Sequence, residues 1–184
     1  MGNIKYMVAM FLLGCVLTGC TPGTEVSPSQ SLSSAEPTTI LTPTPTWTEE
    51  EQSAVDAVHR YLEVWADISH DLEAADWNRI FEVASDPAAD NNVELWREWL
   101  KNGWHLIGGP TFNADLVTPG MIDHQGSRYH VHGCYIITGA HVEDAAGNPV
   151  GNRGIERGRV KYLVLHLTSG RYIVLEEVSE EAAC

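Results

Sequence analysis

The chain has 184 residues, enough for one folded domain with appended segments. It carries 25 Asp and Glu residues against 11 Lys and Arg residues, a formal net charge of −14. This charge argues against nucleic-acid binding, which needs a basic face, and against attachment to anionic lipids by charge attraction.

Residues 1–19 predict a signal peptide. One lysine, Lys5, precedes the apolar run MVAMFLLGCVLTG, which is too short to cross a bilayer. The run leads into LTGC, which ends at Cys20 and resembles the lipobox of bacterial lipoproteins. The resemblance implies that Cys20 becomes the lipidated first residue of a protein held at the outer, extracytoplasmic face of the cell membrane. The alternative is an ordinary signal peptide in which this cysteine is accidental.

Residues 20–47 predict a disordered tether. The segment is rich in Ser, Thr and Pro and has almost no large apolar side chains, so it cannot bury enough surface to offset its chain entropy. The TPTPT stretch favours an extended spacer that lifts a domain off the membrane. Stretches of this composition often carry O-linked sugar, which is a hypothesis here.

Residues 48–184 predict the folded domain, and helices come first. Thr48 and Glu51 form a capping-box pattern, followed by apolar residues at helical spacing as far as Ile68. A second helical pattern covers residues 71–85. A third begins with Asp86 as its N-cap and stops at Gly103.

After residue 103 the period of the pattern changes to two, which indicates strands. Strand regions are expected over residues 104–123, 127–144, 157–168 and 170–178. The last two are joined by a hairpin turn at Ser169-Gly170. Three helices followed by an antiparallel meander predict an α+β domain in which a curved sheet wraps a helix and encloses one apolar pocket.

This order of elements resembles the nuclear-transport-factor-2-like (cystatin-like) cone fold, the superfamily of ketosteroid isomerases and SnoaL-like cyclases. The resemblance covers residues 48–180, and its closest local piece is AVHRYLEVWADISHDLEAADWNRIFEVASDP. It implies N-terminal helices packed on a curved antiparallel sheet. Domains of this fold often dimerise through the sheet, so a homodimer is left open.

The resemblance also implies a site. Tyr61, in VHRY, stands where the isomerases carry a tyrosine that donates a hydrogen bond to an oxyanion, and Asp86-Pro87 matches their general base by spacing. Trp65, one turn further along the helix, is a pocket candidate. Against this, Asp86 reads as a helix cap and a second oxyanion donor has no counterpart. The pattern therefore favours Tyr61 as a core residue with a satisfied hydroxyl.

His130, His132 and Cys134 alternate along one strand and therefore share a face. Such a face could supply zinc ligands, but no second ligand cluster accompanies it. In an exported protein with Cys20 lipidated, Cys134 and Cys184 remain, and oxidation favours a disulfide between them. The two histidines then become pocket-lining or surface residues, and we expect no metal and no cofactor.

The sequence leaves three functions open. The favoured one is a binding or interaction module that holds a small apolar molecule in the cone or docks an envelope protein. The second is an enzyme of the isomerase or dehydratase type that uses Tyr61 and Asp86. The third is a structural envelope protein, which needs no pocket.

Overall fold

The computed structural model describes residues 46–137, 139–151, 157–180 and 184. The predicted signal peptide, Cys20 and nearly all of the predicted tether lie outside these residues. Within the described part of the chain, no helix is both long enough and apolar enough to cross a membrane.

Helix α1 (Glu49–His70) begins as its sequence predicts. The Thr48 hydroxyl accepts a hydrogen bond from the Glu51 backbone N–H (3.2 Å), and the Glu51 carboxylate accepts one from the Thr48 N–H (2.8 Å). These two bonds satisfy donors that a helix start leaves free. One long face of the helix is buried, including Val58, Tyr61 and Ile68.

The second helical pattern forms much less helix than expected. Only a 3-10 turn (Trp77–Arg79) and helix α2 (Ile80–Val83) are helical within it. Asp71 and Asp76 explain the loss, because their carboxylates accept hydrogen bonds from backbone N–H groups two or three residues later (3.1 and 3.0 Å). These local bonds compete with helix formation.

Helix α3 (Ala88–Asn102) stops at Gly103 as predicted, where a left-handed backbone (φ 67°) ends it. The prediction of Asp86 as its N-cap is wrong. Pro87 occupies the cap position and provides no side-chain cap. The backbone carbonyl of Ser85 instead accepts the hydrogen bond from the Ala89 N–H (3.0 Å), so no side chain is needed there.

Four strands form an antiparallel sheet in the order β2-β3-β5-β6: β2 (Thr111–Asp123), β3 (Gly126–Ile136), β5 (Arg157–Leu167) and β6 (Tyr172–Glu180). The hairpin between β5 and β6 was predicted. The long strand predicted over residues 127–144 is instead two strands, because a turn closed by the Ala140 N–H and the Ile137 carbonyl interrupts it (2.8 Å). Its second part, β4 (His141–Glu143), pairs with β1 (His105–Ile107).

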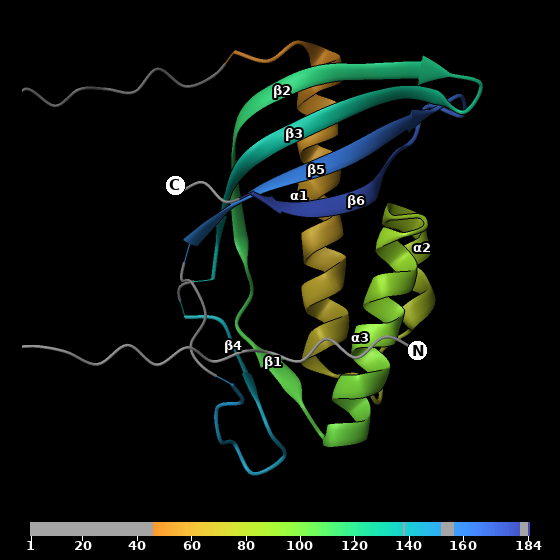
Figure 1. Cartoon of the computed structure of the whole chain (residues 1–184). Helices are drawn as coiled ribbons and strands as arrows, with labels where there is room; N and C mark the ends of the chain where they lie inside the picture. Colours follow the sequence, from red (N-terminus) through yellow and green to blue (C-terminus); the bar gives the residue numbers. More distant parts are fainter. Residues whose placement is uncertain (1–45, 138, 152–156, 181–183) are drawn as a thin grey trace, which may run out of the picture. The chain divides into compact units, whose positions relative to one another are not determined.

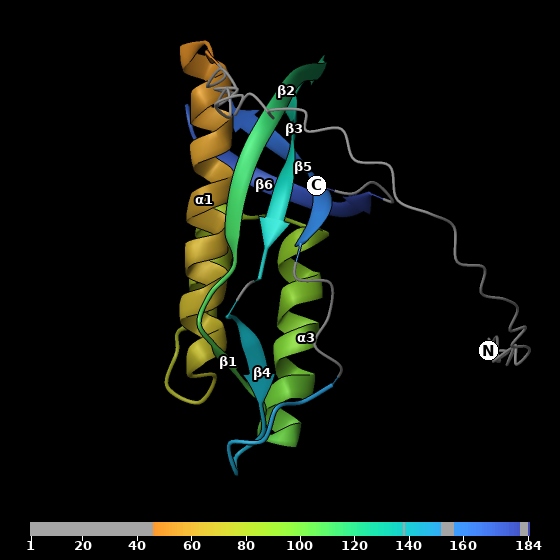
Figure 2. The same cartoon turned by 90° about the vertical axis from the view of Figure 1, so that its left-hand side faces the viewer.

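The sheet curves around α1, while α3 lies below β6 and the β1–β4 ladder runs beside the lower parts of α1 and α3 (Figure 1, Figure 2). The concave face of the sheet and the buried face of α1 form the core, in which Val131, Tyr162 and Val174 are fully buried. The α+β class, with helices packed on a curved antiparallel sheet, is confirmed.

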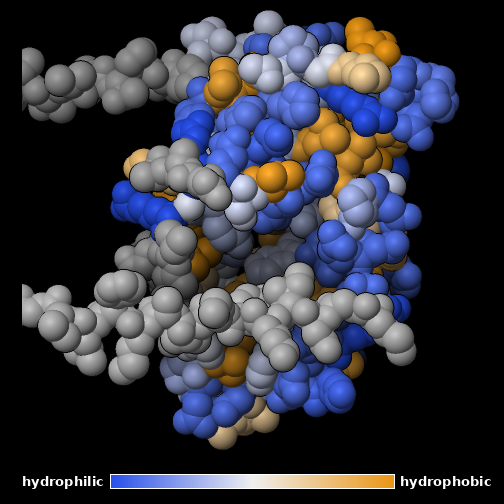
Figure 3. Space-filling view, viewed as in Figure 1, coloured by the Kyte–Doolittle hydropathy of each residue, from blue (hydrophilic) through white to orange (hydrophobic). Residues whose placement is uncertain are grey.

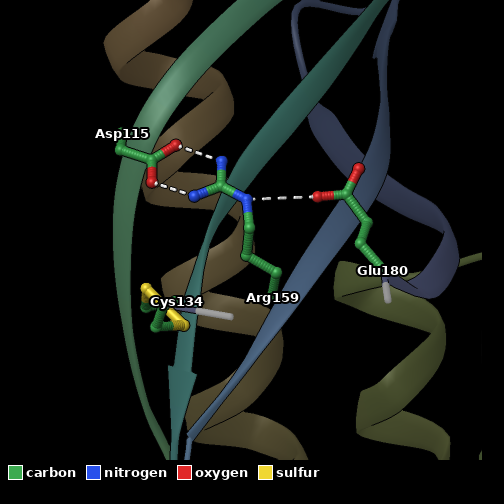
Figure 4. Close-up of a disulfide and its surroundings, with 5 residues drawn as sticks. Asp115, Cys134, Arg159 and Glu180 are labelled. Atoms are coloured by element: carbon green, nitrogen blue, oxygen red, sulfur yellow. Dashed lines mark hydrogen bonds and ion pairs between the residues drawn. A yellow bond between two sulfur atoms is a disulfide. The ribbon is translucent and has the colours of Figure 1, made fainter. Parts of the chain in front are cut away.

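The convex face carries the predicted disulfide between Cys134 and Cys184, whose Cα atoms are 5.7 Å apart (Figure 4). Arg159, the neighbour of Cys134 on β5, forms two hydrogen bonds with the Asp115 carboxylate (2.6 and 2.8 Å). Its Nε lies 3.4 Å from Glu180, which also contacts His132 (3.1 Å). A chain of polar contacts therefore joins all four strands beside the disulfide.

We expect no alkylation of Cys134 or Cys184 before reduction and alkylation of both after it, measured by mass spectrometry of the peptides. Cys184→Ser should lower the free energy of unfolding by about 3–4 kcal/mol, because the bridge spans 50 residues and restricts the unfolded chain. Urea unfolding measures this loss. Alkylation of both thiols without reductant would contradict the bridge.

Candidate functional site

A pocket of about 410 Å³ opens between α1, α3 and the edge strand β6. The space-filling surface is hollowed between β6 and α3 (Figure 3). The pocket is lined by Tyr61, Pro87, Ala88, Asn91, Asn92, Leu95, Glu176, Glu177 and Ser179. Its walls combine apolar, amide, hydroxyl and carboxylate groups, as small-molecule sites do.

Asn92 holds Tyr61 in place at the pocket. Its side-chain amide donates one hydrogen bond to the Tyr61 hydroxyl (2.8 Å) and another to the Ala88 carbonyl (2.9 Å). Both side chains are buried. Burial, followed by the negative charge of Glu177, raises the pKa of Tyr61 well above its ordinary value, so the hydroxyl is neutral at physiological pH.

Glu177 enters the pocket because the β5–β6 ladder shifts register between Leu163 and Val164. Beyond this bulge Glu177 stands opposite Tyr162, on the concave face. Glu177 as a whole residue is exposed, yet desolvation by the surrounding protein raises the pKa of its carboxyl group. The folded chain therefore binds a proton on Glu177 more tightly than the unfolded chain does, and the stability this gives at low pH is lost as the pH rises through the raised pKa.

Tyr162 lies behind Glu177 on β5. The side chain is fully buried, and its hydroxyl has no hydrogen-bond partner among the described residues. Burial and then the charge of Glu177 raise its pKa well above its ordinary value. Its ring contacts Tyr61 and Phe112 edge-on, with centroids 6.1 and 5.2 Å away. A neutral hydroxyl thus stands close to the Glu177 carboxyl group.

The structure does not bring Tyr61 and Asp86 together. Asp86 is exposed and lines a separate groove with His124 and Arg128, and the like charge of Asp90 raises its pKa. Among the described residues, Pro87 and Glu176 border both spaces. An isomerase-type reaction at one ligand atom therefore has no geometric support from this pair of residues.

Trp65, the other helical candidate, is half-buried and packs edge-on against Trp99, with ring centroids 6.2 Å apart. It belongs to the aromatic packing between α1 and α3.

The two strand histidines lie on the opposite face from the pocket. His130 and His132 alternate with Tyr129 and Val131, which are buried against the helices. Cys134 is bonded to Cys184 and so offers no thiolate to a metal. In the described residues, no three His, Cys, Asp or Glu side chains are arranged to hold a metal ion.

The convex face also carries an apolar groove of about 630 Å³, which appears as an apolar patch on β5 and β6 (Figure 3). The groove's apolar lining includes Leu163, Leu165, Leu167, Ile173 and Leu175. The homodimer that the resemblance leaves open would use this face of the sheet, and it stays a prediction.

Sequence reasoning missed Asn92, Tyr162 and Glu177. Asn92 did have a signal, since it is a polar residue in the helical stripe that Ala88 and Trp96 continue. Glu177 had no such signal in the sequence. If side chains alternated regularly from Val174 onward, Glu177 would lie on the convex face, away from the pocket.

No protein-family model matches the chain, and no curated protein matches it significantly in sequence. Among solved structures, the intermembrane space region of chloroplast protein ARC6 matches with a TM-score of 0.55 at 15% identity, over 75% of this chain and 100% of that one.

Two other solved structures have lower TM-scores. Aln2 from a Streptomyces species gives 0.42 at 13% identity, over 75% of this chain and 92% of that one. The iota-carbonic anhydrase from a cyanobacterium, complexed with bicarbonate, matches with a TM-score of 0.39 at 12% identity, over 74% of this chain and 96% of that one. The ARC6 match bears out the cone-like fold and concerns the fold alone.

Two tyrosine substitutions should differ in cost. Tyr61→Phe leaves a buried Asn92 N–H without a partner and should lower the free energy of unfolding by about 1–2 kcal/mol. Tyr162→Phe removes a hydroxyl for which the described residues provide no well-aligned hydrogen-bond partner, so the free energy of unfolding should stay nearly unchanged. Urea unfolding of both variants is the measurement, and equal losses would contradict the assignment.

Proposed function

We propose that this protein is an extracytoplasmic binding module, anchored to the outer face of the cell membrane by lipid on Cys20. In this proposal the module holds a small ligand in the pocket formed by Tyr61, Asn92 and Glu177. The observation that carries the binding role is the pocket between α1, α3 and β6, whose lining places the hydrogen-bonded Tyr61–Asn92 pair and the Glu177 carboxyl around one space.

Two physical arguments support the binding role. A volume of about 410 Å³ falls within the usual range for small-molecule sites. Glu177 has no ion-pair partner among the described residues although the surrounding protein partly desolvates it, and a ligand that pairs with its carboxylate would offset the cost of that desolvation. A purely structural envelope protein has no use for such groups, whereas a receptor for a polar ligand has.

The anchor is tested by growing the producing bacterium with an alkyne analogue of palmitate. We expect label on the wild-type protein and on Cys15→Ser, a matched change inside the apolar run. Cys20→Ser should carry none, because it lacks the thiol that is acylated. Label on Cys20→Ser equal to that of the wild type would contradict the lipobox interpretation.

The pocket is tested with two tryptophan substitutions. Ser179 lines the pocket, so Ser179→Trp should fill it, whereas Ser169→Trp adds the same side chain at the β5–β6 turn. In ligand-observed NMR with a mixture of small polar and apolar molecules, we expect compounds that bind the wild type and Ser169→Trp. They should lose at least roughly tenfold in affinity for Ser179→Trp. Binding that is absent from the wild type, or that survives Ser179→Trp, would contradict the proposal.

A further inference from the structure

The lining of the pocket has an unbalanced charge. Two of its nine residues are glutamates, Glu176 and Glu177, and none is Lys, Arg or His. Among the described residues, neither carboxylate takes part in an ion pair; those of Glu143 and Glu180 do, elsewhere in the domain. Glu177 faces the pocket and Glu176 borders it at the edge shared with the convex groove, so two negative charges with no cation in the lining create a negative potential there.

The aromatic groups behind this wall point to the same kind of ligand. Tyr162 is fully buried and stands opposite Glu177 across the β5–β6 pair. The Tyr61 ring lines the pocket, with its centroid 6.1 Å from that of Tyr162. The electron-rich faces of such rings attract cations, most strongly where water is scarce.

The three classes of small ligand differ in how they meet these groups. An anion would enter against two carboxylates. A neutral apolar molecule would cover Glu177 without pairing it, which costs free energy because the charge loses its water. A cation would pair with the carboxylate and could also lie against the Tyr61 ring.

We propose that the pocket selects a small organic cation whose ammonium group lies beside the Glu177 carboxylate. The carbon groups of the ligand lie over Tyr61. This inference rests on the proposed binding function and replaces the small apolar molecule expected for the cone by a charged one.

The test uses two probes of nearly the same shape, choline and its neutral carbon analogue 3,3-dimethylbutan-1-ol. Binding of each to the full mature protein in detergent is followed by ligand-observed NMR titration. We expect choline to bind at least roughly tenfold more tightly than the alcohol, because the alcohol cannot pair with Glu177.

Three substitutions locate the charge that is responsible. Glu177→Gln should remove the preference for choline and leave the affinity for the alcohol unchanged. Glu177→Asp keeps the charge and should keep part of the preference. Glu98→Gln makes the same change of charge on the exposed surface of α3, and both affinities should stay as in the wild type.

Equal affinities for the two probes, abolished together by Ser179→Trp, would overturn the cation preference and leave the binding function standing. Choline binding that survives Glu177→Gln and Ser179→Trp would place the cation elsewhere and would also overturn the inference. The absence of binding by either probe overturns it too, and the mixture experiment on the same protein then decides separately whether the pocket binds ligands at all.

Discussion

The curvature of the sheet around α1 is the constraint on which the rest of the domain depends. Register shifts in the β2–β3 and β5–β6 ladders bend the sheet, so that its concave face follows the buried side of the helix. Gly133 supports the same bend. A Cβ atom there would lie 2.2 Å from the Asn113 carbonyl oxygen and 2.7 Å from the Phe112 ring, so only glycine lets Phe112 cross β3 and meet Tyr162.

The bulge in β6 links this curvature to the site. Val174, which precedes the bulge, faces the core. Glu177 and Ser179, which follow it, face the concave side of the sheet. Without the bulge, Glu176 and Val178 would face that side instead. One additional residue in the strand thus exchanges the faces of everything that follows. The bulge in β6 therefore both places the Glu177 carboxyl group in the pocket and contributes to the curvature of the sheet.

The sequence therefore predicts the parts of this domain that depend on local chemistry. The Thr48–Glu51 cap, the Gly103 stop and the Ser169-Gly170 turn each follow from a few neighbouring residues, and the disulfide follows from counting the cysteines of a chain predicted to be exported. The second helix is shorter than its pattern because Asp71 and Asp76 bond to nearby backbone groups. Glu177 escaped prediction because a bulge arises from long-range packing.

The disulfide and the ion pairs act on the strand that carries the site. Strand β6 is an edge strand that pairs with β5, and among the described residues its other edge accepts one backbone hydrogen bond, from the Ser85 N–H to the Val174 carbonyl. Beyond Val174 the strand lines the pocket, and an edge held by one ladder opens easily. The bridge to Cys184 and the Arg159–Glu180 contact fix its far end. An ion pair at the surface contributes at most about 1 kcal/mol, and Arg159 and Glu180 are only half-buried, so most of this restraint comes from the disulfide. The oxidised bridge on the convex face thereby keeps Glu177 in place on the concave one.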